Sequence, residues 1–191
     1  MTNKQVTQVR VSKGWIDFGI GQPQTDNLPL EQLEEAANHR FQQKDRRILA
    51  YGVEQGNGKF RITLARFLAA QYGQTVDPDH LFITGGVSQA LDMICGLKTR
   101  PGDTVIVEEP SYFLALRIFA DYKLNVIGTP IDENGILIEA LEEKLEKYKP
   151  VFVYTIPVFH NPTGVTLSTS RRKKLTDLSE KYDFFIVADE V

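Results

Sequence analysis

The feature that most constrains the fold is the alternation of short β-rich runs with amphipathic helical patterns from Leu81 onward. This pattern predicts an α/β fold in which helices cover both faces of a mostly parallel sheet. The strand candidates are rich in β-branched and aromatic residues, and they span 81–84, 104–108, 125–129, 151–156 and 184–189. The helix candidates have apolar residues three and four apart, and they span 88–98, 112–121, 138–148 and 169–182. Right-handed crossovers would place the carboxyl ends of all these strands along one edge.

Two more helices are predicted upstream. Their apolar positions are Leu30, Leu33, Ala37 and Phe41 in the first, and Phe60, Leu64, Phe67 and Leu68 in the second. Residues 14–29 are rich in glycine, proline and asparagine, which indicates an ordered but irregular entry segment.

The composition excludes several classes of protein. A chain of 191 residues with 42% hydrophobic and 25% charged residues can bury a core without disulfide staples. It has no apolar run of the ~20 residues needed to span a bilayer, and its first ten residues lack the apolar stretch of a secretory signal. We therefore expect a cytoplasmic protein that does not bind a membrane.

The charged and metal-binding residues give no sign of nucleic acid or metal. The net charge is -3, and the one basic cluster, 171–174, lies among acidic residues on a predicted helix, where a solvated face is expected. Three histidines, His39, His80 and His160, lack metal-ligand spacing, so we predict no metal site. The single cysteine, Cys95, excludes an internal disulfide and fits a buried apolar position.

The first candidate binding segment is a glycine-rich turn at 84–88. In open α/β sheets ligands bind beyond the carboxyl ends of the strands, and this turn leads from a predicted strand into a helix. The free N–H groups and positive dipole of a helix N-terminus, with the Ser88 hydroxyl, suit a phosphate group. A purely structural turn in which Ser88 is the N-cap fits equally well. The G-x-G-x-x-G spacing of a nucleotide-binding Rossmann turn is absent.

Three further residues follow predicted strands. Tyr112 opens a helix, where its ring can stack on a heteroaromatic ligand or simply pack. Asn161 precedes a proline and is pushed toward extended geometry, so its amide can reach a ligand oxygen or cap a turn. Asp189 ends an apolar run, and a buried carboxylate is costly unless it faces a cation or a protonated ring nitrogen.

Together these segments resemble the fold-type-I, class I and II aminotransferases, which use pyridoxal phosphate. The matching runs are Gly-Gly-Val-Ser-Gln-Ala at 85–90, Glu-Pro-Ser-Tyr at 109–112, Asn-Pro-Thr-Gly at 161–164 and Asp-Glu-Val at 189–191. The resemblance extends from Asp17 over nearly the whole chain and is most similar to the branch of 2-aminoadipate aminotransferases and MocR-type regulators. It implies that 1–29 belong to the family's small domain and 30–191 to the first part of its cofactor-binding large domain.

The resemblance also implies how the phosphate and the ring are held. Val87 and Ser88, with Gln89 nearby, would cradle the phosphate at the helix N-terminus. Tyr112 would stack on the pyridine ring.

The polar atoms of the ring are assigned in the same way. Asn161 would hydrogen-bond the phenolic oxygen beside the substrate, and Asp189, the one catalytic residue implied here, would keep the ring nitrogen protonated. Tyr51 matches the tyrosine that reaches the phosphate of the neighbouring subunit in a homodimer, while Ile20 and Gly21 match the segment near the substrate carboxylate. Amino acids and 2-oxo acids are the implied substrates.

No lysine of this chain matches the family's Schiff-base lysine, which lies beyond the strand that ends at Asp189. We therefore expect the chain to be an N-terminal portion that is inactive alone, binds cofactor weakly and is prone to aggregate. A regulator's ligand-sensing domain is an alternative, disfavoured because a chain that starts at Met1 leaves no room for an upstream winged helix. A non-catalytic remnant and another reaction of the same cofactor also remain open.

Overall fold

The computed structural model describes residues 14, 16 and 23–190, and the chain divides into two compact units, Met1–Gly52 and Val53–Val191. The first unit contains the short 3-10 helices η1 (Thr25–Asn27) and η2 (Arg46–Leu49) and the helix α1 (Leu30–Gln42). None of the residues of α1 is buried within the described chain. The predicted first helix is thus confirmed, and its apolar side chains Leu30, Leu33 and Phe41 are exposed.

The second unit begins with helix α2 (Gly58–Tyr72) and the 3-10 helix η3 (Pro78–His80). The Asn57 side chain caps α2 by accepting a hydrogen bond from the Phe60 amide at 3.1 Å, and Gly73, with φ of 66°, ends it. The buried Arg61 donates to the Pro78 carbonyl at 2.6 Å, which ties α2 to η3.

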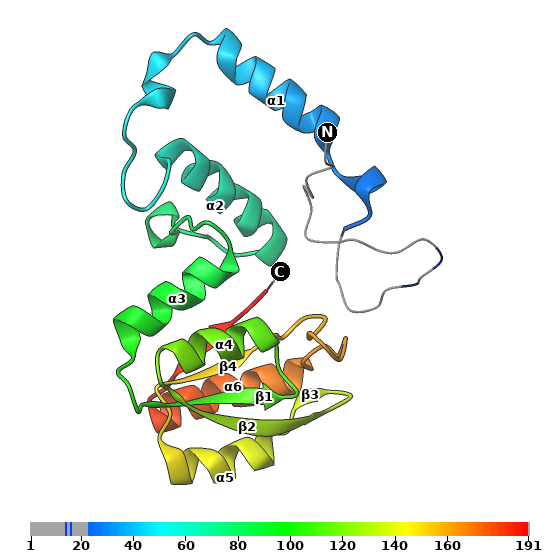
Figure 1. The fold of residues 1–191 in the computed structure, drawn as a ribbon, viewed down its shortest axis with the longest axis vertical. Coiled ribbons are helices and arrows are strands. Elements are labelled where there is room, and N and C mark those ends of the chain that lie inside the picture. Colours follow the sequence, from blue (N-terminus) through cyan, green and yellow to red (C-terminus); the bar gives the residue numbers. More distant parts are fainter. Residues whose placement is uncertain (1–13, 15, 17–22, 191) are drawn as a thin grey trace. The chain divides into compact units, whose positions relative to one another are not determined.

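A five-stranded sheet forms the centre of this unit (Figure 1). Its strands in chain order are β1 (Thr104–Glu109), β2 (Asn125–Asp132), β3 (Gly135–Ile136), β4 (Phe152–Thr155) and β5 (Phe185–Ala188). The spatial order is β3-β2-β1-β4-β5, and every pair is parallel except the β2–β3 hairpin. Because β1 pairs in parallel with β4, and β4 in parallel with β5, the carboxyl ends of these three strands share one edge.

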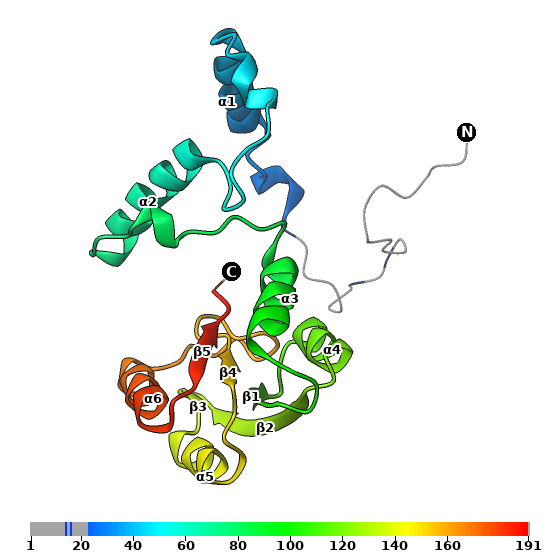
Figure 2. The same ribbon diagram turned by 90° about the vertical axis from the view of Figure 1, so that its left-hand side faces the viewer.

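Helices cover both faces of the sheet, as predicted. Helices α3 (Val87–Lys98) and α4 (Phe113–Asp121) lie on one face, and α5 (Ile138–Tyr148) and α6 (Thr169–Tyr182) lie on the other (Figure 2). Alternating strand residues supply two separate cores, as the pleat requires. The first contains Leu91, Cys95, Val105, Val107, Ala115, Phe119, Leu124, Phe152, Tyr154 and Ile156. The second contains Ile106, Ile136, Ile138, Leu141, Leu145, Val153, Leu167, Leu175, Leu178 and Phe184.

One predicted strand is wrong and one strand was not predicted. Residues 81–84 form no strand in the described chain, where the Ile83 amide donates to the Gln55 carbonyl at 2.9 Å instead of pairing along a sheet. The two-residue strand β3 follows a turn in which the Asp132 side chain accepts from the Asn134 amide at 2.7 Å. Among the described helices, none is long and apolar enough to cross a membrane.

Candidate functional site

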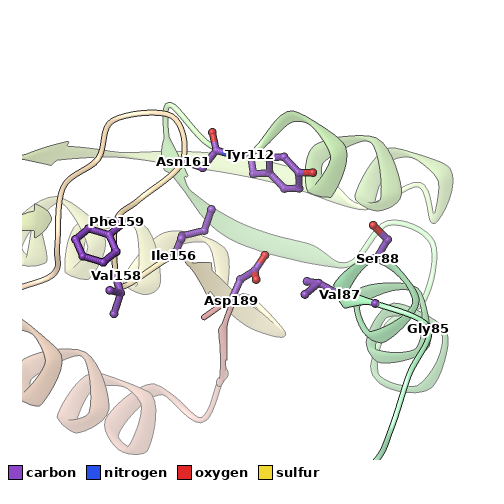
Figure 3. Close-up of a pocket in the computed structure, with 10 residues that line it drawn as sticks. Gly85, Val87, Ser88, Tyr112, Ile156, Val158, Phe159, Asn161 and Asp189 are labelled. Atoms are coloured by element: carbon purple, nitrogen blue, oxygen red, sulfur yellow. The ribbon is translucent and has the colours of Figure 1, made fainter. Parts of the chain in front are cut away.

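A cavity of about 400 Å³ lies beyond the carboxyl ends of β1, β4 and β5. This size is within the usual range of small-molecule sites. Its walls come from the turn at 85–88, from Tyr112 after β1, from the segment after β4 and from Asp189 after β5 (Figure 3). The structure therefore brings Val87, Ser88, Tyr112, Asn161 and Asp189, all singled out from the sequence, to one pocket.

The amino end of α3 forms one side of this cavity. Gly86 is the N-cap, and its φ of 98° is a left-handed conformation that favours glycine. Ser88 is therefore not the N-cap, which contradicts the structural alternative for this residue. Val87 and Ser88 lie in the first helical turn with exposed side chains, where free N–H groups and the helix dipole favour an anion.

Side chains within the turn fix its backbone. The Thr84 hydroxyl donates to the Gly86 carbonyl at 3.0 Å. The carboxamide oxygen of Gln89 accepts a hydrogen bond from the Gly85 amide. Gln89 does not line the cavity, so in the structure it supports the turn, and its predicted proximity to a phosphate stays a prediction.

The Asp189 carboxylate is a buried polar group of the pocket with only one of its two oxygens hydrogen-bonded. Its side chain is 6% exposed, and Oδ2 accepts a hydrogen bond from the Tyr154 hydroxyl at 2.7 Å. Oδ1 is buried and has no hydrogen-bond partner among the residues that the structure describes. A buried oxygen without a partner, on a residue that lines a cavity, calls for a hydrogen-bond donor or a cation that the described residues do not supply.

Asn161 lies in the loop between β4 and α6, whose two ends are held together. The Leu167 amide donates to the Pro157 carbonyl at 2.9 Å, and the His160 amide donates to the Val165 carbonyl at 2.8 Å. From α6, Arg172 donates to the Pro157 and Leu167 carbonyls at 2.9 and 3.0 Å. Asn161 itself is exposed, so its amide is available to a ligand.

A buried acid lies beneath this loop. Glu108, 1% exposed, accepts hydrogen bonds from the Thr155 hydroxyl and the Ile156 amide, both at 2.9 Å. His160 Nε2 is 3.2 Å from Glu108 Oε2, although the angles there are not those of a hydrogen bond. Burial raises the pKa of Glu108 and lowers the pKa of His160, so each moves toward its neutral form.

The remaining walls are apolar or aromatic. Tyr112 is half-buried at the start of α4, and its ring meets Phe113 edge to face at a centroid distance of 5.4 Å. Ile156, Val158 and Phe159 follow β4, and the Phe159 side chain is 77% exposed. A planar ring with one polar edge fits a pocket of this make-up.

Three further predicted residues are not among the described residues that line the cavity. Tyr51 belongs to the first unit and is fully exposed, and Ile20 and Gly21 lie outside the described residues. No cluster of three or more His, Cys, Asp or Glu side chains suited to a metal occurs in the described part of the chain.

The sequence reasoning missed Glu108, Tyr154, Ile156, Val158 and Phe159. Strand alternation could have paired Tyr154 with Phe152 on one face, but it could not show that the hydroxyl meets Asp189. The proximity of Glu108 to His160 arises from residues 52 positions apart, and no local pattern encodes it.

Comparison with known proteins links this arrangement to one family. The model for aminotransferase class I and II matches residues 13–191. The chain is 36% identical to aromatic-amino-acid aminotransferase 1 of Thermococcus litoralis, over 91% of this chain and 43% of that protein. It is 31% identical to the uncharacterized HTH-type transcriptional regulator YcxD of Bacillus subtilis, over 93% of this chain and 40% of the regulator.

A solved structure shares the fold. The α-aminoadipate aminotransferase LysN of Thermus thermophilus, complexed with N-(5'-phosphopyridoxyl)-L-leucine, matches with a TM-score of 0.80 and 32% identity, covering 91% of this chain and 43% of LysN. The chain thus spans less than half the length of the relatives it matches.

Proposed function

The chain belongs to the class I and II aminotransferases, and from that premise we propose that it forms the cofactor-binding part of a pyridoxal-phosphate-dependent transaminase. The observation that carries the proposal is that Asp189, whose Oδ1 has no partner in the described part of the chain, lines the same cavity as the α3 N-terminus. The two features recognise the two ends of one molecule, an acidic ring N–H and a phosphate.

The residues present fit pyridoxal phosphate. The free oxygen of Asp189 would accept the ring N–H, the backbone at 85–88 would hold the phosphate, Tyr112 would stack on the ring and Asn161 would bind its phenolic oxygen. When bound, the cofactor supplies an electron sink for the negative charge that forms when an amino acid loses its α-proton.

The chain's own residues would bind and orient rather than transfer protons. Asp189 carries the charge that opposes a protonated ring nitrogen, and the surrounding apolar side chains Ile156 and Val158 limit water near it. The clamped loop sets the position of Asn161. In this proposal amino acids and 2-oxo acids are the substrates, with Ile20, Gly21 and Asn161 near them, and Tyr51 acts toward a partner subunit of a homodimer.

Binding without a covalent bond is expected to be weak. A charge-assisted contact at Asp189 contributes about 1.5 to 3 kcal/mol, stacking about 0.5 to 1.5 and the helix dipole up to about 2. Association costs at least about 4 kcal/mol, so a dissociation constant of about millimolar or weaker follows. This chain alone is proposed to bind the cofactor but not to complete transamination.

A ligand-sensing domain of a transcription regulator is the second candidate. The observation that favours it is the 31% identity to the HTH-type regulator of Bacillus subtilis. Both candidates use the same pocket, so the two differ in what the complete protein does with the bound molecule. A DNA-binding segment encoded in frame with this chain would favour the regulator.

An NMR titration with pyridoxamine phosphate tests the shared proposal. We expect amide shifts at 85–88 and near Asp189, a loss of the shifts at 85–88 with unphosphorylated pyridoxamine, and binding at least tenfold weaker in D189N. The control variant D183N changes an exposed aspartate at the end of α6 and should bind as the wild type does. Shifts confined to other regions, or equal binding by D189N, would argue against the proposal.

A further inference from the structure

The two carboxylate oxygens of Asp189 differ in their hydrogen bonding, and the Tyr154 hydroxyl is the donor that makes the difference. Oδ2 accepts a hydrogen bond from the Tyr154 hydroxyl at 2.7 Å, whereas Oδ1 has no partner within residues 23–190 and belongs to a residue that lines the cavity. Tyr154 does not line the cavity, but its hydroxyl contacts Asp189, which does.

Tyr154 is held rigidly. Its side chain is 0% exposed, and its ring meets the Phe119 ring nearly edge to face, with centroids 5.5 Å apart and planes at 76°. It lies on β4 beside Val187 of β5, and the next residue, Thr155, accepts a hydrogen bond from the Asp189 amide at 2.9 Å. Consecutive residues of β4 therefore fix both the backbone and the side chain of Asp189.

The hydroxyl is a permanent donor. Burial, followed by the hydrogen bond to Asp189, raises the pKa of Tyr154 far above neutrality, so its proton stays in place. Glu108 and Tyr112 are the other ionisable groups whose charges act on it, and both act in the same direction. An ionised carboxylate can only accept hydrogen bonds, so the proton of Tyr154 points to Oδ2.

We infer that Tyr154 is a positioning residue that turns Asp189 Oδ1 toward the cofactor and keeps the proton on the ring nitrogen rather than on the carboxylate. The inference rests on the proposed function of the pocket. A donor on Oδ2 stabilises the negative charge of the carboxylate and so weakens its pull on the proton of the ring nitrogen. Without the Tyr154 hydroxyl, Oδ2 would also lack a hydrogen-bond donor, and the proton of the ring nitrogen would move toward the Asp189 carboxylate.

The test uses the 191-residue chain and pyridoxamine phosphate labelled with ¹⁵N in the ring. In the wild type at neutral pH we expect the bound ring nitrogen to resonate as a pyridinium. In Y154F, which keeps the ring that packs on Phe119, we expect the resonance to move toward neutral pyridine and the affinity to fall about three- to tenfold. If Y154F only weakened the packing of the pocket, the affinity would fall but the bound ring nitrogen would stay protonated.

The chain offers a matched control. Tyr122 also donates to an aspartate, Asp92, at 2.9 Å, but neither residue lines the cavity. Y122F removes the same kind of hydrogen bond and should leave both the resonance and the affinity unchanged. In a D189N background, Y154F should have no further effect on the resonance, because the carboxylate charge through which Tyr154 acts is gone.

The possible outcomes distinguish a failure of the proposed function from a failure of the role inferred for Tyr154. If the wild type does not bind pyridoxamine phosphate, the proposed function and this inference fall together. If the wild type binds with a protonated ring and Y154F gives the same resonance, the function of the pocket stands and the role of Tyr154 is overturned. The same holds if Y154F changes the resonance equally in the D189N background.

Discussion

Replacing Arg172 with alanine should loosen the loop that carries Asn161 without disturbing the sheet. Arg172 donates to the Pro157 carbonyl at 2.9 Å and to the Leu167 carbonyl at 3.0 Å, and so joins the two ends of the loop to α6. Its guanidinium is also 3.7 Å from Glu190, with the arginine side chain 38% exposed.

The magnitude follows from these contacts. A hydrogen bond from a charged donor contributes about 1.5 to 3 kcal/mol when buried, and partial exposure reduces each to about 1 kcal/mol. The two hydrogen bonds together contribute about 2 kcal/mol, and about 1 kcal/mol of this is offset by the side-chain entropy that the ordered arginine loses. The Pro157 carbonyl keeps its second partner, the Leu167 amide, so no orphan is created there. The net cost is about 1 kcal/mol, or about a fivefold shift toward an open loop.

Amide hydrogen exchange measures this shift directly. In R172A the His160 and Leu167 amides should exchange about fivefold faster, while the Asp189 amide, which donates to Thr155 of the sheet, should keep its rate.

The adjacent residue provides the control. Arg171 on the same helix binds Asp132 at 2.7 Å and the Gly135 carbonyl at 2.8 Å, so R171A should affect the β2–β3 hairpin instead. Equal exchange at 157–168 in R172A and R171A would refute the reasoning.

Three further predictions follow from other parts of the structure. First, G135A should lower the free energy of unfolding by about 2 to 4 kcal/mol in a urea titration, because φ is 93° there and a Cβ would lie 2.7 Å from Leu167 Cδ1 and 3.0 Å from its Cα. The control variant G58A has open space around the added Cβ and should be nearly neutral. Second, burial lowers the pKa of His160, so the folded state resists protonation, and the stability that is present above pH 6.5 is lost as the pH falls below that value. H160Q should make this loss of stability less steep, whereas H39Q, at an exposed site, should not. An unchanged slope in H160Q would contradict the assignment. Third, the exposed apolar side chains Leu33, Phe41, Phe60 and Phe67 should make the isolated chain self-associate, and a concentration-independent monomer on gel filtration would count against this.

Local periodicity predicted the helices well. The ranges 138–148 and 169–182 have the same bounds as α5 and α6, because each helix buries one apolar face against the sheet and the sequence shows the three- and four-residue spacing of that face. The strands β1, β2, β4 and β5 were predicted with small errors at their ends. Residues 81–84 have the composition of a strand, but pairing depends on a distant neighbour that composition does not reveal.

The candidate site was predictable to the extent that it lies at strand ends. Topology alone places Tyr112, Asn161 and Asp189 at one edge, and the cavity there is the expected consequence. Hydrogen bonds between neighbouring strands were not predictable, which is why Tyr154 and the pair Glu108 and His160 were missed. The predicted roles of all these residues stay predictions: Val87, Ser88, Gln89, Tyr112, Asn161, Asp189, Tyr51, Ile20 and Gly21.

The most direct test of the central claim is a crystal structure of the chain with pyridoxamine phosphate. We expect the ring nitrogen to lie within hydrogen-bond distance of Asp189 Oδ1 and the phosphate to contact the backbone amides at 85–88. A well-ordered ligand bound outside this cavity, or bound inside it with the phosphate against Asp189, would show that the pocket does not hold the cofactor as proposed.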